Sequence, residues 1–133
     1  MKRSLLNKWI ARLEDPTTKQ GKNMLLKKDG SMCCLGVLCD IVDPNGWTEM
    51  PDEDWGLLRK FFVYNKDSNS SYLELPKNLA DELNMFQTGY PIEGKKDSIA
   101  LINMNDDGIS FKEIAALLRN NPKVYIRTIE EDV

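Results

Sequence analysis

The apolar stretch at residues 32–42 constrains this chain more than any other part of its sequence. It runs Met-Cys-Cys-Leu-Gly-Val-Leu-Cys-Asp-Ile-Val, and Asp40 is its only charged residue. The stretch is much shorter than the roughly 20 residues that cross a bilayer, so the rest of the chain has to bury it. We predict a short buried helix that ends at the Asp-Pro-Asn-Gly turn of residues 43–46. A strand that begins at residues 31–33 is the alternative, because periodicity does not distinguish the two in a short apolar run.

The size and composition of the chain predict one domain. The 133 residues match the usual size of a single domain, so we expect residues 1–133 to share one core. The net charge of −3 argues against a dedicated nucleic-acid binder, which generally carries an excess of basic residues. No apolar run approaches the length of a membrane span, and Lys8, Arg12 and Glu14 interrupt any signal peptide. We therefore expect a cytoplasmic protein that does not bind a membrane.

Apolar residues at helical spacing predict two helices in the first half of the chain. The first begins with Ser4 as its cap and ends at residue 14, because the residue before Pro16 avoids the helical region. The second begins near Pro51, where acidic side chains at residues 52–54 favour the positive end of a helix. Its predicted buried side consists of Trp55, Leu58, Phe61 and Phe62.

Two more helices are predicted in the second half. One begins at Pro76 and turns Leu79, Ala80 and Leu83 inward. The other covers residues 111–119, because Ser110 and Glu113 have the spacing of a capping box. The apolar residues 98–104 fit either a strand or a helix.

Short β-like segments predict a small sheet. These segments are residues 23–28 before the Asp29-Gly30 turn, 62–64, 72–75 and 124–129. Polar residues 66–71 and the Gly- and Pro-containing residues 87–96 are predicted loops. The expected fold is an α+β domain with about four helices packed on a small, mainly antiparallel sheet.

The three cysteines, Cys33, Cys34 and Cys39, predict buried thiols. Their number is odd, which argues against a disulfide framework. They lack the paired C-x-x-C spacing of zinc sites, and the chain has no histidine, the commonest neutral metal ligand. We therefore expect neither a metal nor another cofactor, and thiols that serve as small buried hydrophobes. A nucleophilic role for Cys34 would require helix amides or a lysine to generate the thiolate.

Polar residues beside the apolar segments are the candidate ligand contacts. Asp40 lies at the end of the central stretch, and Asn105 and Asp106 follow another core segment. Lys19 and Gln20 lie in a polar loop. Two of these have structural alternatives. Asp40 fits a helix cap or an ion-pair partner, and residues 105–108 fit a turn before the last helix, since they lack the pattern of a calcium loop.

Three segments carry a resemblance to a known family. They are Lys-Gln-Gly at residues 19–21, Cys-Cys-Leu-Gly-Val-Leu-Cys-Asp at residues 33–40, and Asn-Asp-x-Gly-x-Ser-Phe-x-Glu-Ile-Ala at residues 105–115. In this order, together with Trp9 and the Leu-Pro pair at residues 75–76, the sequence resembles small proteins of tailed bacteriophages and prophages. The chain departs from that pattern by Asn-Met before Asn105 and by a longer loop at residues 66–71. The resemblance implies a location in the cytoplasm of an infected bacterium, and it implies no activity.

These observations favour a non-catalytic binding protein, with counter-defence as a possible role. The expected partner is a small polar ligand, such as a nucleotide, or a host protein. Lys19 would neutralise an anionic group of the ligand, and Trp9 would supply a stacking face. Gln20 and Asn105 would form hydrogen bonds. Asp40 and Asp106 would accept hydrogen bonds from hydroxyls or amines. The alternatives are an enzyme that uses Asp40, Asp106 or Cys34, and a DNA-binding regulator. A further alternative is that the motifs serve only as core residues and helix caps. The working surface would then be an aromatic surface that forms a homo-oligomer or binds a partner.

Overall fold

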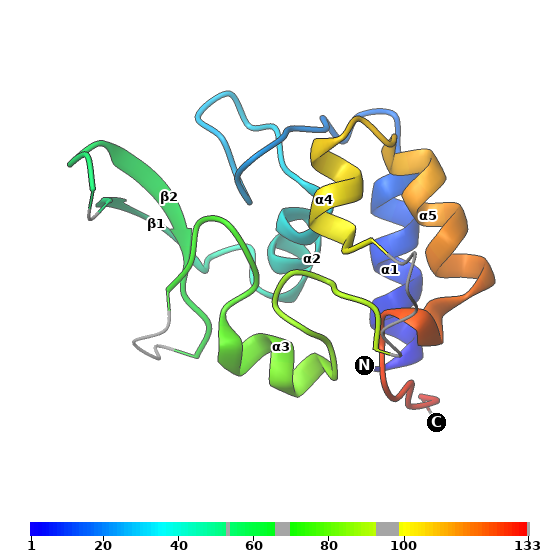
Figure 1. Ribbon diagram of the computed structural model, residues 1–133. Helices are drawn as coiled ribbons and strands as arrows, with labels where there is room; N and C mark the ends of the chain where they lie inside the picture. Colours follow the sequence, from blue (N-terminus) through cyan, green and yellow to red (C-terminus); the bar gives the residue numbers. More distant parts are fainter. Residues whose placement is uncertain (53, 66–69, 93–98, 133) are drawn as a thin grey trace.

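The computed structural model describes residues 1–52, 54–65, 70–92 and 99–132. Within that part, five α-helices, one 3₁₀ turn and a two-stranded antiparallel sheet form an α+β domain, which confirms the predicted fold class. The sheet lies at one end of the molecule and helices α1 and α5 at the other, with α2 between them (Figure 1). Most of the core is therefore packed between helices rather than against the sheet. No helix in these residue ranges has the length and apolar character of a membrane span.

Helices α1 (Arg3–Glu14) and α5 (Phe111–Asn120) pack against each other. Both bury one apolar stripe and leave charged residues outside, as their spacing predicts. The capping box of α5 is confirmed, because the Ser110 hydroxyl accepts a hydrogen bond from the Glu113 N–H at 3.2 Å. The helix ends before Pro122, where the 3₁₀ turn η1 (Pro122–Val124) begins.

The central apolar stretch forms helix α2 (Cys34–Val42), as predicted. Gly36 lies where this helix meets the backbone of Leu25, and a β-carbon at this position would collide with the Leu25 carbonyl oxygen. Glycine normally weakens a helix interior. Here its missing side chain allows α2 to lie directly against a neighbouring segment of main chain.

Helices α3 (Lys77–Leu83) and α4 (Leu101–Asp106) complete the helical part. The predicted helix after Pro76 is confirmed, and it ends at Asn84 in the left-handed conformation, with φ of 62°. The structure resolves the ambiguity of residues 98–104 in favour of a helix that begins at Leu101. Ser98, residues 66–69 of the first predicted loop and residues 93–96 of the second lie outside the described residues.

The helix predicted from Pro51 is wrong. The chain forms a hairpin instead, with strands β1 (Trp47–Pro51) and β2 (Leu58–Phe62). The Asp52 carboxylate accepts from the Trp55 N–H at 2.7 Å, and Gly56 has a φ of +66°, so this segment reverses direction rather than continuing as a helix. Glu53, part of the predicted acidic turn, lies outside the described residues. Of the four residues predicted to be buried, only Phe62 is fully buried.

Of the predicted β-like residues 62–64, only Phe62 lies in a strand, at the end of β2, and the other predicted strands do not form. Residues 23–28 contribute one bridge, between Leu26 and Met32, and residues 72–75 and 124–129 contain no strand. Tyr125 and Ile126 are buried in the core without strand pairing. Their apolar composition is therefore used for burial in the core.

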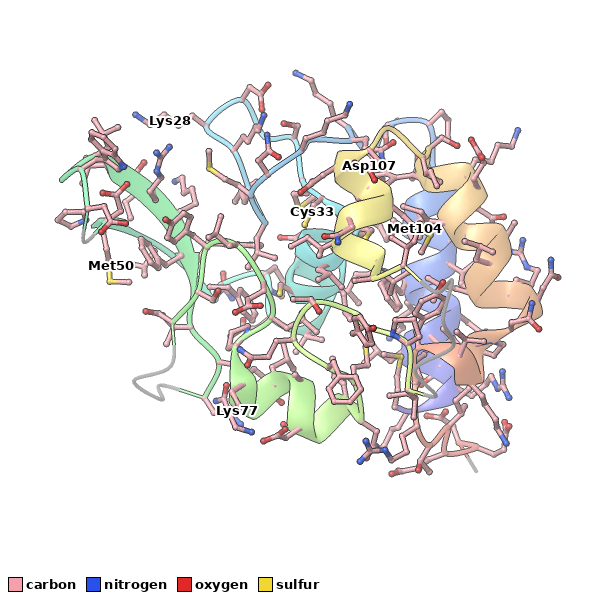
Figure 2. The ribbon with its side chains drawn as sticks, viewed as in Figure 1. Lys28, Cys33, Met50, Lys77, Met104 and Asp107 are labelled. Atoms are coloured by element: carbon pink, nitrogen blue, oxygen red, sulfur yellow. The ribbon has the colours of Figure 1, made fainter. Side chains whose placement is uncertain are left out.

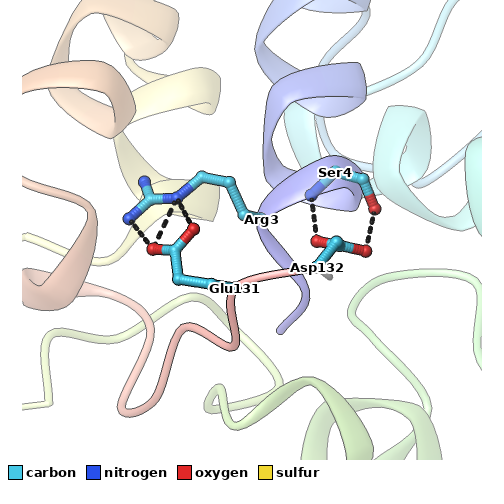
Figure 3. A network of polar contacts seen from close by, with 4 residues as sticks. All are labelled: Arg3, Ser4, Glu131 and Asp132. Carbon is cyan, nitrogen blue, oxygen red and sulfur yellow. Dashed lines mark hydrogen bonds and ion pairs between the residues drawn. The ribbon is translucent and has the colours of Figure 1, made fainter.

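The two ends of the described chain meet at α1 (Figure 3). Ser4, the predicted cap, lies inside the helix, and Lys2 occupies the cap position. The Ser4 N–H and hydroxyl instead both donate to the Asp132 carboxylate, at 2.9 and 2.7 Å, beside an Arg3–Glu131 ion pair. A carboxylate from the distant end of the chain therefore caps this helix and complements its dipole.

Candidate functional site

Two of the predicted ligand residues, Gln20 and Asn105, meet inside the molecule. Asn105 is fully buried, and its side-chain oxygen accepts hydrogen bonds from the Gln20 amide at 3.0 Å and the Cys34 N–H at 3.2 Å. Its amide nitrogen donates to the Gly21 carbonyl at 2.8 Å. Asn105 thus joins the three segments that carry the family resemblance, and it caps the first turn of α2.

Gln20 and Asp106 extend this network. The Gln20 amide also donates to the Ile109 carbonyl at 2.8 Å, and its oxygen accepts from the Phe111 N–H at 3.0 Å. The Asp106 carboxylate accepts from the Asn23 N–H at 2.9 Å. Among the described residues, every buried side-chain nitrogen and oxygen has a hydrogen-bond partner. The network therefore uses its polar atoms to join segments of the fold.

The other predicted contacts do not join this network, so the six residues do not form one site. Trp9 is fully buried and donates its indole N–H to the Cys34 carbonyl at 2.9 Å, which leaves no ring face for a ligand. Lys19 is exposed and pairs with Asp29 at 3.2 Å. Asp40 lies six residues beyond Cys34 on α2, about 9 Å along the helix axis.

The three thiols are buried, as predicted. Cys33 is 1% exposed, and Cys34 and Cys39 are fully buried. Burial raises the pKa of Cys33 to about 11, against the opposing effect of nearby backbone N–H groups, and it also raises the pKa of Cys34 and Cys39. Within the described ranges, no group of three or more Cys, Asp or Glu side chains is placed to hold a metal ion. Buried, protonated thiols are poor nucleophiles.

Asp40 faces a surface hollow between α1 and α2. Its carboxylate accepts hydrogen bonds from Arg12 at 3.1 Å and from the Trp47 indole at 3.0 Å. The hollow has a volume of 460 Å³. Its lining includes Lys8, Arg12, Asp15, Asp40, Ile41 and Pro44.

A second hollow of 390 Å³ adjoins the first, because Lys8 and Ile41 line both. Its lining also includes Lys2, Leu5, Val42, Tyr64, Glu82 and Glu130. Burial raises the pKa of Tyr64 to about 12, and a hydrogen bond with the Glu82 carboxylate adds to this effect. The phenol therefore remains protonated and donates its hydrogen bond to Glu82. We call the two hollows together the α1–α2 groove.

The groove follows one stripe of α1. Leu5, Lys8, Arg12 and Asp15 are three or four residues apart, which places them in a row on the helix surface. Lys8 lies at the centre of the row and is exposed. Sequence reasoning used Lys8 and Arg12 to argue against a signal peptide. Their helical spacing was visible, but their proximity to residues of α2 was not. Aliphatic side chains, cations, carboxylates and a phenol together can bind a small molecule that has both an apolar and a polar part.

The comparisons with known proteins give a family and no function. The chain matches no curated protein and no solved structure. A family model, described as "Domain of unknown function (DUF8296)", matches residues 1–122. Nearly the whole described fold, from α1 to the start of η1, thus lies within the match. The chain belongs to the DUF8296 family.

Proposed function

We propose that this protein binds a small polar ligand, of the nucleotide class, in the α1–α2 groove without transforming it. The observation that carries the proposal is the position of Lys8 at the centre of two adjoining hollows of 390 and 460 Å³. Hollows of this size are typical of small-molecule sites. Lys8 would pair with a phosphate, and the apolar side chains of Leu5 and Ile41 would pack against a base.

The polar groups of the groove support recognition rather than catalysis. The Tyr64 oxygen, whose hydrogen is directed to Glu82, would accept from a ligand donor, and the Glu82 carboxylate would also accept from a ribose hydroxyl or an exocyclic amine. Asp40 already accepts hydrogen bonds from Arg12 and Trp47 on its two oxygens. The buried thiols lie elsewhere in the core.

The biological role is also a proposal. The resemblance to phage proteins, together with a groove suited to a nucleotide, supports a role in counter-defence inside an infected bacterium. The protein would withdraw a nucleotide signal by holding it. This role requires tight binding and does not require turnover.

Isothermal titration calorimetry with mononucleotides and cyclic dinucleotides tests the proposal. We expect at least one of these nucleotides to bind with one site per chain, and Lys8→Gln to weaken that binding at least tenfold. Lys112→Gln, an exposed change on α5, is the matched control and should bind like the parent. Chromatography of the nucleotide after incubation should recover it intact. Absence of binding across the panel, equal binding by Lys8→Gln, or conversion of the nucleotide would contradict the proposal.

A further inference from the structure

Strand β2 has an outer edge that is paired at one end and open at the other. In an antiparallel pair, the main-chain groups of successive residues point alternately toward the partner strand and away from it. Val63 donates to the Gly46 carbonyl in line with β1, whereas Phe62 exchanges both hydrogen bonds with Ser71 on the outer side, at 2.7 and 3.2 Å. By alternation, Lys60 and Leu58 also direct their N–H and C=O groups outward. Within the described ranges, no other residue forms a backbone hydrogen bond with these groups.

A groove runs along this open edge. Its far wall is the loop of residues 24–29, which is held near the strand because the Leu25 N–H donates to the Tyr72 carbonyl at 2.8 Å, next to Ser71. The groove has a volume of 360 Å³. Aliphatic side chains of Met24, Leu26 and Leu58 contribute to its lining. We call it the β2 edge groove.

The rim of the β2 edge groove is basic. Lys27 and Lys28 line it and form no ion pair with another described residue. Figure 2 shows the Lys28 side chain on the side of its loop that faces the hairpin. Lys60 and Arg59 also line the groove and pair with Glu49 at 3.5 Å and Asp52 at 3.1 Å. Among the described lining residues the one carboxylate is that of Asp29, which pairs with Lys19 at 3.2 Å, so Lys27 and Lys28 are the unpaired charges. The protein as a whole is acidic, so this local excess of cations marks a surface that attracts a negatively charged partner.

We propose that the β2 edge groove binds an extended acidic peptide of a partner protein, which adds to the hairpin as a third strand. Main-chain groups of Leu58 and Lys60 would pair with the peptide backbone. Alternate side chains of the peptide would point to the aliphatic lining and to the lysine rim. The site lies apart from the α1–α2 groove and does not depend on the nucleotide proposal.

Two other occupants fit the groove less well. A nucleic acid would be attracted by the basic rim, but the described residues of the lining include no aromatic ring on which a base could stack. A second copy of this chain, paired edge to edge through β2, would bring the basic rims of the two copies together, and like charges across a strand pair are destabilising. An acidic peptide satisfies both the open main chain and the charge.

A fluorescein-labelled peptide of alternating glutamate and valine residues is the probe for this site. We expect a saturable rise in fluorescence anisotropy, and we expect Lys27→Glu combined with Lys28→Glu to weaken binding at least tenfold. Both lysines are outside the core, so circular dichroism should show an unchanged fold. Lys112→Glu, one charge reversal of the same kind on α5, is the control and should bind nearly as the parent does.

Two isomers of the peptide, N-methylated on one or the other alternate set of residues, test strand addition itself. One set of N–H groups faces β2 and the other faces away, so one isomer should lose binding and the other should retain it. Hydrogen exchange at the Lys60 amide should slow when the unmodified peptide binds. Equal binding by both isomers, tighter binding of an oligouridine than of the peptide, or no binding up to about 1 mM would each overturn the proposal.

Discussion

The region around Asn105 and the β1–β2 hairpin use their residues in opposite ways. Around Asn105 the polar side chains are partnered, and the thiols beside it are buried. In the hairpin, Trp55 is 78% exposed and Leu57 55% exposed, and β2 has an open edge. The segments with the most recognisable sequence pattern hold the fold together, whereas a region with no recognisable motif offers unsatisfied backbone and apolar surface. A distinctive motif therefore indicates that its residues are constrained, but it does not distinguish a constraint from ligand binding from one imposed by the fold.

The largest difference between the regions should come from Gly36→Ala. The added methyl group would meet the Leu25 carbonyl, and main chain on both sides leaves little room for relaxation. We expect a loss of about 3 kcal/mol or more in the free energy of unfolding, measured in urea. Gly56→Ala in the hairpin turn is the comparison, because a β-carbon there meets no atom within 4 Å and only its positive φ opposes the change. An equal loss in both variants would mean that α2 does not lie against Leu25.

Asn105→Ala should be nearly as harmful. It removes the acceptor of the Cys34 N–H and the donor to the Gly21 carbonyl inside the protein, and each unsatisfied buried group costs about 1–3 kcal/mol. We expect a total loss of about 2–4 kcal/mol in the same urea measurement. Asn103→Ala, an exposed position on the same helix, should change stability by less than about 0.5 kcal/mol. A small effect at Asn105 would show that the network is dispensable.

Alkaline pH should weaken the thiol-containing core. The pKa of Cys33 is about 11 in the folded protein and 9.0 in its ordinary state, so its contribution is complete below pH 9. As pH rises from 9 toward 11, the unfolded chain loses this proton first, and stability falls by about 2 kcal/mol. Urea titrations from pH 8 to 10.5 measure the slope, which Cys33→Ala should reduce. At pH 8 the native thiols should react slowly with Ellman's reagent, and fast reaction of all three would contradict a buried core.

Ser110→Ala should have a moderate effect. It removes the side-chain acceptor of the Glu113 N–H at the start of α5, which costs about 1 kcal/mol. Thermal and urea unfolding measure the change, and Ser110→Asp, which retains an acceptor, should recover most of the loss. Failure of Ser110→Asp to recover stability would argue that the hydroxyl acts through packing rather than as a cap.

Trp55→Ser should have the smallest effect on stability. Because the side chain is mostly exposed, we expect a change of less than about 0.5 kcal/mol in the urea measurement. A large destabilisation would mean that the hairpin contributes to the stability of the fold as the region around Asn105 does. An unchanged stability together with reduced self-association in native mass spectrometry would instead identify Trp55 as part of a contact surface.

The sequence predicted those elements whose signals are local. Three helices have such signals. A capping box precedes α5, Pro76 precedes α3, and α2 is a continuous apolar run, so a few neighbouring residues indicate each helix. The hairpin was missed because Trp55, Leu58, Phe61 and Phe62 also fit helical spacing, and Gly56 was not considered as a turn signal.

The site was predicted less well than the fold because its contacts are distant in sequence. Gln20 and Asn105 are 85 residues apart, and no pattern in a single sequence pairs them. Asp40 was identified as a residue at the margin of the core, but its partners Arg12 and Trp47 come from α1 and β1, whose packing the sequence does not give. Lys8 was overlooked because an exposed lysine on a helix carries no signal of its own.

The position of Asn105 has a consequence for how the protein is made. The side-chain oxygen of Asn105 accepts from the Cys34 N–H and from the Gln20 amide, and it is synthesised 71 residues after the first and 85 residues after the second. Until that part of the chain leaves the ribosome, the apolar α2 segment lacks its cap and its packing against α4, although α1 is already available to cover one side of it. Chains that emerge in this order depend on late loop closure and expose aggregation-prone surface in the meantime. A nascent chain stalled before residue 105 should therefore bind chaperones more strongly than one stalled after α5.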